Sequence, residues 1–333
     1  MKKIIKYSKK NDDLVKIKKS LILENNINLK NTLGINSLYN KQKKRNKCII
    51  CNLKLESNDF TSHKVDYSFC RRCEHLNGKN FISKNFNKKI YTSNSGKEYS
   101  KIYSKLYSER LNKIYIPKVK FMKNSIKEKL KVLDIGCGAG HFVKSCELNH
   151  ISADGIDPNQ TLVSFGNKNL KKNKLYCLDF DKIIDKINKT EANLISCIFV
   201  LEHLENPNEI FKAFKKSSAK YFYLAVPLVS FSTFIENAFP KVYPRQLGGA
   251  HTNLYSEKSL KYISKKYDLK SVSEWWFGSD FLDLYRSLSL SFNYKSKIFE
   301  KKFHKYFLKH INQFQKILDQ SSSSSEVHMI LRK

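Results

Sequence analysis

A glycine-rich turn follows a short apolar run near the middle of the chain. Residues 132–143 read VLDIGCGAGHFV, with glycines at Gly136, Gly138 and Gly140. Glycine lets a backbone turn tightly and approach a ligand, and the helix that follows offers unpaired N–H groups to a polar ligand. The spacing is GxGxG, whereas dinucleotide folds prefer GxGxxG. The sequence therefore predicts a strand-turn-helix unit that binds a different nucleotide-like cofactor.

Acidic residues stand where neighbouring strands should end. Asp134 lies in the strand before the turn, and Asp157 follows Gly140 by 17 residues in the sequence GIDP. The acids that bind ribose in related folds lie about 20 residues on, so Asp157 is predicted to accept the ribose hydroxyls. Asp179 and Phe180 follow a third strand and are predicted beside adenine. The alternative is that Asp157 and Asp179 are helix N-caps.

Four cysteines form two pairs in the N-terminal part of the chain. Their spacing is C-x2-C-x18-C-x2-C, with the residues Cys48, Cys51, Cys70 and Cys73. Two such pairs are typical of a four-thiolate zinc site, which is closed to water and structural. His63 and His75 are spare ligands. The alternatives are four free thiols or a redox pair.

Two histidines follow predicted strands and suit proton transfer. His203 lies in LEHLENP and His251 in GGAHTNLYS. Imidazole is the side chain that most readily exchanges a proton near neutral pH. His203, His251 and Glu202 are therefore predicted to contact a substrate that is to be modified, called the acceptor below, and to remove a proton from it. The alternative is structural, with Glu202 and His203 fixing the loop before Pro207. Weaker acceptor-side candidates are Tyr91, Tyr99 and Tyr103.

The elements that must position these residues alternate from residue 131 onward, which favours a parallel sheet. Strands are predicted at Lys131–Ile135, Ser152–Asp157, Lys174–Leu178, Asn193–Val200, Tyr221–Val226, Leu269–Trp276 and Glu326–Leu331. Helices are predicted at Phe142–Leu148, Gln160–Leu170, Pro207–Ser217 and Glu257–Tyr267. Two segments break the alternation and are interpreted as insertions: Leu228–Asn253 and the helical Ser279–Gln320.

The 333 residues divide into four predicted parts. They are a basic leader (1–45), a zinc-binding module (46–80), a Tyr-rich helical linker (81–128) and a cofactor-binding domain (129–333). The net charge is +32, but only seven of the 62 basic residues are Arg, which favours a solvated lysine coat over nucleic-acid recognition. Residues 1–130 hold 32 basic and 10 acidic residues, so an anionic partner is expected there. With no signal peptide and no membrane-spanning run, we expect a cytoplasmic protein.

The ordered set VLDIGCGAGHF, GIDP, LDF and FVLEHLENP resembles class I S-adenosylmethionine-dependent methyltransferases of small molecules over residues 131–333. This resemblance implies a Rossmann-like α/β fold with a seven-stranded sheet, a small N-terminal zinc ribbon and helical insertions. It also implies S-adenosylmethionine as the methyl donor, and histidines placed like His203 and His251 recur in that family. The zinc module with its Tyr-rich stretch resembles both sugar C-methyltransferases and certain ribosomal RNA methyltransferases, although the long C-terminal domain of the sugar enzymes is missing.

These features are compatible with three functions. The favoured one is O- or C-methylation of a small anionic acceptor, a nucleotide-linked sugar or a glycan precursor for polysaccharide biosynthesis. The second is methylation of ribosomal or transfer RNA. LEHLENP stands where base-modifying enzymes often carry Asn/Asp-Pro-Pro-Tyr/Phe, and Arg is scarce. The third is a non-catalytic interaction module, which the intact glycine turn and Asp157 argue against. The sequence leaves the oligomeric state open.

Overall fold

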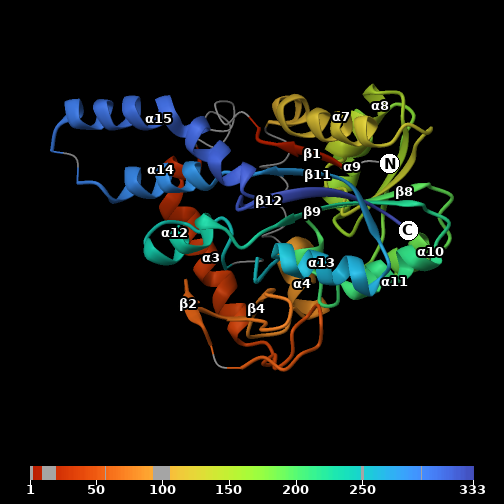
Figure 1. Cartoon of the computed structure of the whole chain (residues 1–333), viewed down its shortest axis with the longest axis horizontal. Coiled ribbons are helices and arrows are strands. Elements are labelled where there is room, and N and C mark those ends of the chain that lie inside the picture. The colour runs from red at the N-terminus through yellow and green to blue at the C-terminus, as the bar shows by residue number, and fades with distance from the viewer. Residues whose placement is uncertain (1–2, 10–19, 57, 93–105, 249–250, 294) are drawn as a thin grey trace.

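The computed structural model describes residues 3–9, 20–56, 58–92, 106–248, 251–293 and 295–333. Two β-sheets organise these residues, a large central one and a small antiparallel one (Figure 1). Tyr99 and Tyr103 lie outside the described residues, so the prediction for them is not tested.

The central sheet has eight strands in the order β1-β11-β12-β9-β8-β5-β6-β7. Their bounds are β1 (Ile4–Tyr7), β5 (Lys131–Ile135), β6 (Ser152–Asp157), β7 (Leu175–Cys177), β8 (Leu194–Ile198), β9 (Tyr221–Pro227), β11 (Lys270–Phe277) and β12 (Glu326–Arg332). All pairs are parallel except those of β12, which runs antiparallel to both β9 and β11. The predicted Rossmann-like fold and its seven strands are confirmed.

The eighth strand, β1, was not predicted. It pairs in parallel with β11 at the edge of the sheet, and all four of its residues are exposed. An edge strand without a buried face shows no apolar alternation, so IIKY in a lysine-rich leader gave no strand signal.

Helices cover both faces of the central sheet, as the sequence predicted for a parallel sheet (Figure 1). One apolar core lies under α7 (Ile116–Ser125), α8 (His141–Leu148) and α9 (Gln160–Asn169). The other lies under α10 (Phe180–Asn188), α11 (Asn208–Lys216) and α13 (Glu257–Lys266). The carboxyl ends of β5, β6 and β8 thus open between two helical layers, where open α/β sheets bind their ligands.

The small sheet joins distant parts of the chain. Its strands are β2 (Phe60–Ser62), β3 (Val65–Phe69), β4 (Leu76–Gly78) and β10 (Asn253–Leu254), in the order β10-β4-β3-β2. The first three belong to the four-cysteine region, but β10 comes from the insertion after β9. Cys48, Cys51, Cys70 and Cys73 share one core with α11 and α13. The module therefore packs directly on the main domain.

Helices surround these sheets at the N-terminal and C-terminal ends of the chain. The former are α2 (Ser20–Leu23), α3 (Asn25–Asn40), α4 (Lys84–Thr92) and α6 (Tyr107–Arg110), and a π-helical turn (Leu111–Tyr115) joins α6 to α7. The insertions contain α12 (Phe231–Ala238), α14 (Asp280–Ser291) and α15 (Lys297–Gln320). Figure 1 shows α14 and α15 projecting together from one end of the molecule. Among the described residues, no helix is long and apolar enough to cross a membrane.

Candidate active site

The glycine turn leaves β5 with an unusual backbone. Gly136, Gly138 and Gly140 have φ angles of 68°, 52° and 72°, a left-handed region that side chains rarely adopt. A Cβ at Gly136 would collide with the side chain of Val200, whereas at Gly138 the nearest atom is 3.9 Å away. The turn is therefore packed on one side and open at Gly138, where a ligand can approach the backbone.

Asp157 lies beside this turn at the end of β6. Its Oδ2 accepts the N–H of Gly138 at 2.8 Å, and its Oδ1 accepts the N–H of Asn159 at 2.9 Å. The N-cap of α9 is Asn159, whose side chain accepts the N–H of Leu162, so Asp157 is not the cap. Burial raises the pKa of Asp157. Since a carboxylate offers about four acceptor positions, two remain for ligand hydroxyls.

The other two acids differ in their surroundings. Asp134 is buried in the sheet, where its Oδ1 accepts the hydroxyl of Ser196 at 2.7 Å and burial raises its pKa to about 7. Asp134 stabilises strand β5, which precedes the turn. It does not line the cavity that opens at the carboxyl ends of the strands. Asp179 occupies the N-cap position of α10 without a side-chain cap hydrogen bond, and it lines that cavity with Phe180.

One cavity of about 1300 Å³ connects the predicted cofactor residues with the predicted acceptor residues. Gly138, Asp157 and Phe180 line it, and so do His203 and His251. Pockets for a single small ligand measure roughly 300–1,000 Å³. The cavity therefore has room for a cofactor and an acceptor together.

A buried lysine also lines this cavity. Lys118 on α7 is 4% exposed, and burial lowers its pKa to about 7. Its Nζ lies 4.8 Å from the ring centroid of Tyr115 and 5.0 Å from that of Phe199. Within the described part of the chain it has no hydrogen bond or ion pair. An anionic ligand at this place would offset the cost of burying a charged ammonium group.

The predicted acceptor residues form one cluster. The ligand atoms of Glu202, His203 and His251 lie within 4.8 Å of one another, close enough to hold a metal ion. The His203 and His251 ring centroids are 4.7 Å apart, and Nε2 of His203 is 3.8 Å from Oε1 of Glu202. Nδ1 of His203 is hydrogen-bonded to the hydroxyl of Tyr91 at 3.0 Å, and Asn87 donates to its carbonyl.

Burial sets the electrostatics of this cluster. Glu202 is fully buried, and neither of its carboxylate oxygens has a hydrogen-bond partner among the described residues. Burial raises the pKa of Glu202 to about 8, so its carboxyl group is mostly protonated at neutral pH. Burial, together with the charges of His203 and Arg245, holds the pKa of His251 well below its usual range. The His251 imidazole is therefore neutral and able to accept a proton.

The comparisons with known proteins agree with this geometry. A family model described as a methyltransferase domain matches residues 107–274. The chain belongs to this family. It is an S-adenosylmethionine-dependent methyltransferase with a Rossmann-like α/β fold. A comparison with curated proteins gave no match.

Solved methyltransferase structures resemble the enzyme at low identity. One from Archaeoglobus fulgidus is 18% identical, and the match covers 69% of this chain and 100% of that one with a TM-score of 0.43. The magnesium protoporphyrin IX methyltransferase from Synechocystis PCC 6803 is 12% identical, covering 57% and 90% with a TM-score of 0.45. The plantazolicin methyltransferase BamL is 16% identical, covering 76% and 96% with a TM-score of 0.47.

The methyltransferase carries a four-cysteine cluster in its N-terminal region, as predicted. The Sγ atoms of Cys48 and Cys73 are 3.6 Å apart, and those of Cys51 and Cys70 are 3.3 Å apart. Zinc–sulfur bonds of about 2.3 Å place neighbouring sulfurs of a tetrahedron about 3.8 Å apart, so the four thiols fit such an ion after a small expansion. His75 is fully buried and its ring packs edge-on against Tyr255.

The small sheet of this module holds the segment that carries His251. Strand β10 begins two residues after His251 and pairs with β4, and the N–H of Gly78 donates to the carbonyl of Thr252 at 2.6 Å. The hydroxyl of Tyr67 on β3 accepts the N–H of Gly248 at 2.6 Å. The four-cysteine region thus positions one of the two histidines in the cavity.

Nothing in the sequence indicated that Lys118 lines the cavity or that Tyr67 accepts a hydrogen bond from the segment before His251. Neither stands in a recognisable motif, and Lys118 is one lysine in a lysine-rich chain. The one available signal for Lys118 was its place shortly before β5. A helix at that point packs on α8, the helix that follows the glycine turn.

Proposed function

We propose that the enzyme methylates a small molecule, a nucleotide-linked sugar or a related glycan precursor, at a hydroxyl or an acidic C–H group. The observation that carries this proposal is the pair His203 and His251, which line the same cavity as the glycine turn. Methyl transfer needs a donor and an acceptor held in line and, for these acceptors, a group that removes a proton.

The donor half of the cavity has a proposed role for each side chain. S-adenosylmethionine supplies a methyl group from its sulfonium. Gly136, Gly138 and Gly140 let the backbone approach it, Asp157 accepts the ribose hydroxyls, and Asp179 and Phe180 lie at the adenine. Lys118 is paired with the methionine carboxylate, the one anionic group of this donor. Asp134 acts indirectly by holding the strand beneath the turn.

The acceptor half has a proposed proton path. Neutral His251 takes the proton of the acceptor, and His203 contacts the acceptor from the adjacent turn. Glu202 is a positioning residue, because its Oε1 lies 3.8 Å from Nε2 of His203 and its side chain does not line the cavity. Since Glu202 is mostly protonated at neutral pH, its proposed role is to hold the ring of His203 in place as a neutral carboxyl group.

The four cysteines are proposed to hold a structural zinc ion. Four thiolates close its coordination shell, so the ion would take no part in the reaction. Its proposed effect is to keep β3 and β4 in register with β10, and so to hold His251 in place.

Labelled S-adenosylmethionine tests the substrate class. The purified enzyme is incubated with a panel of nucleotide sugars and, separately, with unmodified RNA. Label in a nucleotide sugar that is lost in His251→Ala supports the proposal. Label in RNA alone overturns it in favour of RNA methylation. Absence of S-adenosylhomocysteine binding in calorimetry would favour the non-catalytic alternative.

A further inference from the structure

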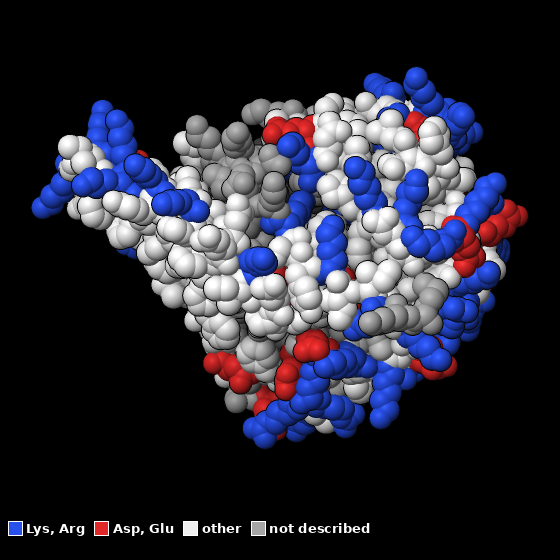
Figure 2. Space-filling model, turned by 45° about the horizontal axis from the view of Figure 1, so that its top comes forward, with Lys and Arg blue, Asp and Glu red and all other residues white. Residues whose placement is uncertain are grey.

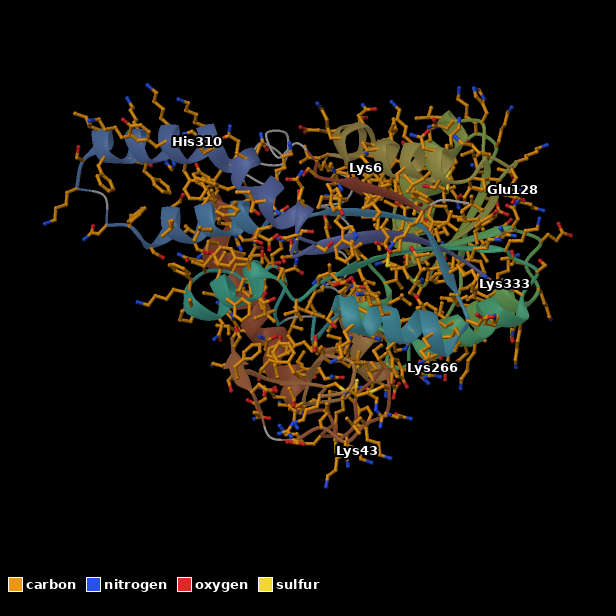
Figure 3. All side chains as sticks on the ribbon, in the orientation of Figure 1. Lys6, Lys43, Glu128, Lys266, His310 and Lys333 are labelled. Atoms are coloured by element: carbon orange, nitrogen blue, oxygen red, sulfur yellow. The ribbon has the colours of Figure 1, made fainter. Side chains whose placement is uncertain are left out.

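The outer face of α15 carries large apolar side chains in water. Phe299, Tyr306 and Ile317 are 55%, 65% and 65% exposed. Their spacing of 7 and 11 residues places them within about 20° of one another around the helix. We call these three residues the apolar stripe. Ile311 packs on α14 about 120° away from Phe299 around the helix, so the stripe lies outside the packed face (α15 carries the label His310 in Figure 3).

The stripe continues onto neighbouring helices. Phe314 is 41% exposed, and its ring lies 5.1 Å from that of Phe281 on α14. Phe281 in turn lies 5.9 Å from Phe231 on α12, which is 40% exposed. Single exposed apolar residues are ordinary on a protein surface, whereas a band across three helices indicates an interaction site.

Lysines border the stripe along its open side. Lys302, Lys309 and Lys316 are exposed, and their seven-residue spacing forms a row roughly 60–100° from the stripe. We call these three residues the lysine row. Residues 301–318 contain no Asp or Glu, so nothing on that part of the helix neutralises the row. Figure 2 shows Lys and Arg side chains gathered on the projecting arm beside uncharged surface.

The apolar stripe and the lysine row together indicate what kind of partner can bind α15. A symmetric dimer places each patch against its own copy, and antiparallel α15 helices would bring the two lysine rows together. Like charges at that distance oppose the contact. A surface that offers both apolar contacts and a high density of negative charge complements the stripe and the row at once.

We propose that α15 binds flat on an anionic lipid bilayer. The apolar stripe would lie at the boundary between headgroups and acyl chains, and the lysine row would contact lipid phosphates, as in other basic amphipathic helices. This inference goes beyond the proposed function and does not depend on it. The helix rests on the surface and spans nothing.

Sedimentation with lipid vesicles tests the proposal on the full-length enzyme. We expect the wild type to sediment with vesicles of phosphatidylglycerol and phosphatidylcholine, and to remain in solution with phosphatidylcholine alone. Replacing the lysine row (Lys302→Gln, Lys309→Gln, Lys316→Gln) should weaken the partition about 100-fold, since each surface lysine contributes about fivefold. Raising the salt should have a similar effect in the wild type.

Two further variants complete the test. The triple variant Phe299→Ser, Tyr306→Ser, Ile317→Ser should also lose vesicle binding. Its thermal midpoint should stay close to that of the wild type, since the three side chains are more than half exposed and the ring contact of Phe299 with Phe292 lies at the end of the helix. The matched control replaces three exposed lysines elsewhere, Lys168, Lys182 and Lys189, by Gln and should bind vesicles normally. The proposal is overturned if the wild type ignores anionic vesicles, or if the control loses as much binding as the lysine-row variant. A dimer in light scattering that the Ser variant dissociates would assign the stripe to a second copy.

Discussion

Replacing Lys118 by Met should weaken cofactor binding without unfolding the enzyme. The side chain is 4% exposed, lines the cavity and has no anionic partner within hydrogen-bond distance among the described residues. A hydrogen bond between charged groups contributes about 2 kcal/mol, which corresponds to roughly 30-fold in the dissociation constant of S-adenosylhomocysteine. Methionine has a similar length and no charge, so the apolar contacts with Tyr115 and Phe199 are kept. Calorimetric titration measures the change.

The proton balance gives this prediction a second readout. Burial lowers the pKa of Lys118 to about 7 in the free enzyme, so at pH 8 only about a tenth of the molecules carry the charge. A bound carboxylate favours the protonated form and raises that pKa, so binding should take up about 0.9 proton per site at pH 8. Titrations in buffers of different ionisation enthalpy report this number. Below pH 6 the lysine is already charged, and the uptake should vanish.

The matched control is Lys120→Met on the exposed side of the same helix. It should leave both the affinity and the proton uptake unchanged. Equal S-adenosylhomocysteine affinity in Lys118→Met and wild type would refute the pairing with the methionine carboxylate. So would the absence of proton uptake in wild type at pH 8, whatever the affinity of the variant.

The remaining predictions concern the other proposed roles. Asp157→Ala should weaken S-adenosylhomocysteine binding by about 100-fold in calorimetry, since charged hydrogen bonds to two ribose hydroxyls are lost; unchanged affinity would contradict the assignment. His251→Ala should lower kcat by about 10²- to 10⁴-fold with cofactor affinity intact. The acid limb of the wild-type kcat profile should lie below pH ~6.5, and His203→Gln should shift it upward because a positive neighbour of His251 is removed; a limb that does not move would contradict this electrostatic coupling. Zinc analysis should find one ion per chain, lost in Cys48→Ser; a second ion lost in His251→Ala would assign the histidine cluster to a metal. Tyr67→Phe should lower kcat about fivefold with unchanged cofactor affinity, since a hydrogen bond worth about 1 kcal/mol holds the His251 segment.

The donor half of the site was predictable because its signals are local. The glycine turn and Asp157 each follow a strand that reads clearly from its own apolar run, and the order of strands in the fold then brings them together. Two errors have the same physical origin. Strand β1 has no buried face, and the helical segment Ser279–Gln320 was treated as one stretch although it breaks between α14 and α15. An exposed edge strand and a short break between two helices change the periodic pattern of apolar residues very little, so the sequence does not reveal them.

The acceptor half depends on contacts between distant segments. His203 and His251 are 48 residues apart, and nothing in either motif indicates that their rings meet. The pairing of β4 with β10 links residues that are more than 170 positions apart, so the sequence could predict the zinc module without predicting what it holds. That pairing explains why a structural metal site would accompany a catalytic domain that already has its own core. His251 lies near the end of the insertion Leu228–Asn253, and the pairing of β10 with β4 fixes the position of this segment. Removal of zinc should therefore reduce methyl transfer while the glycine turn, which follows β5 of the central sheet, continues to bind S-adenosylhomocysteine.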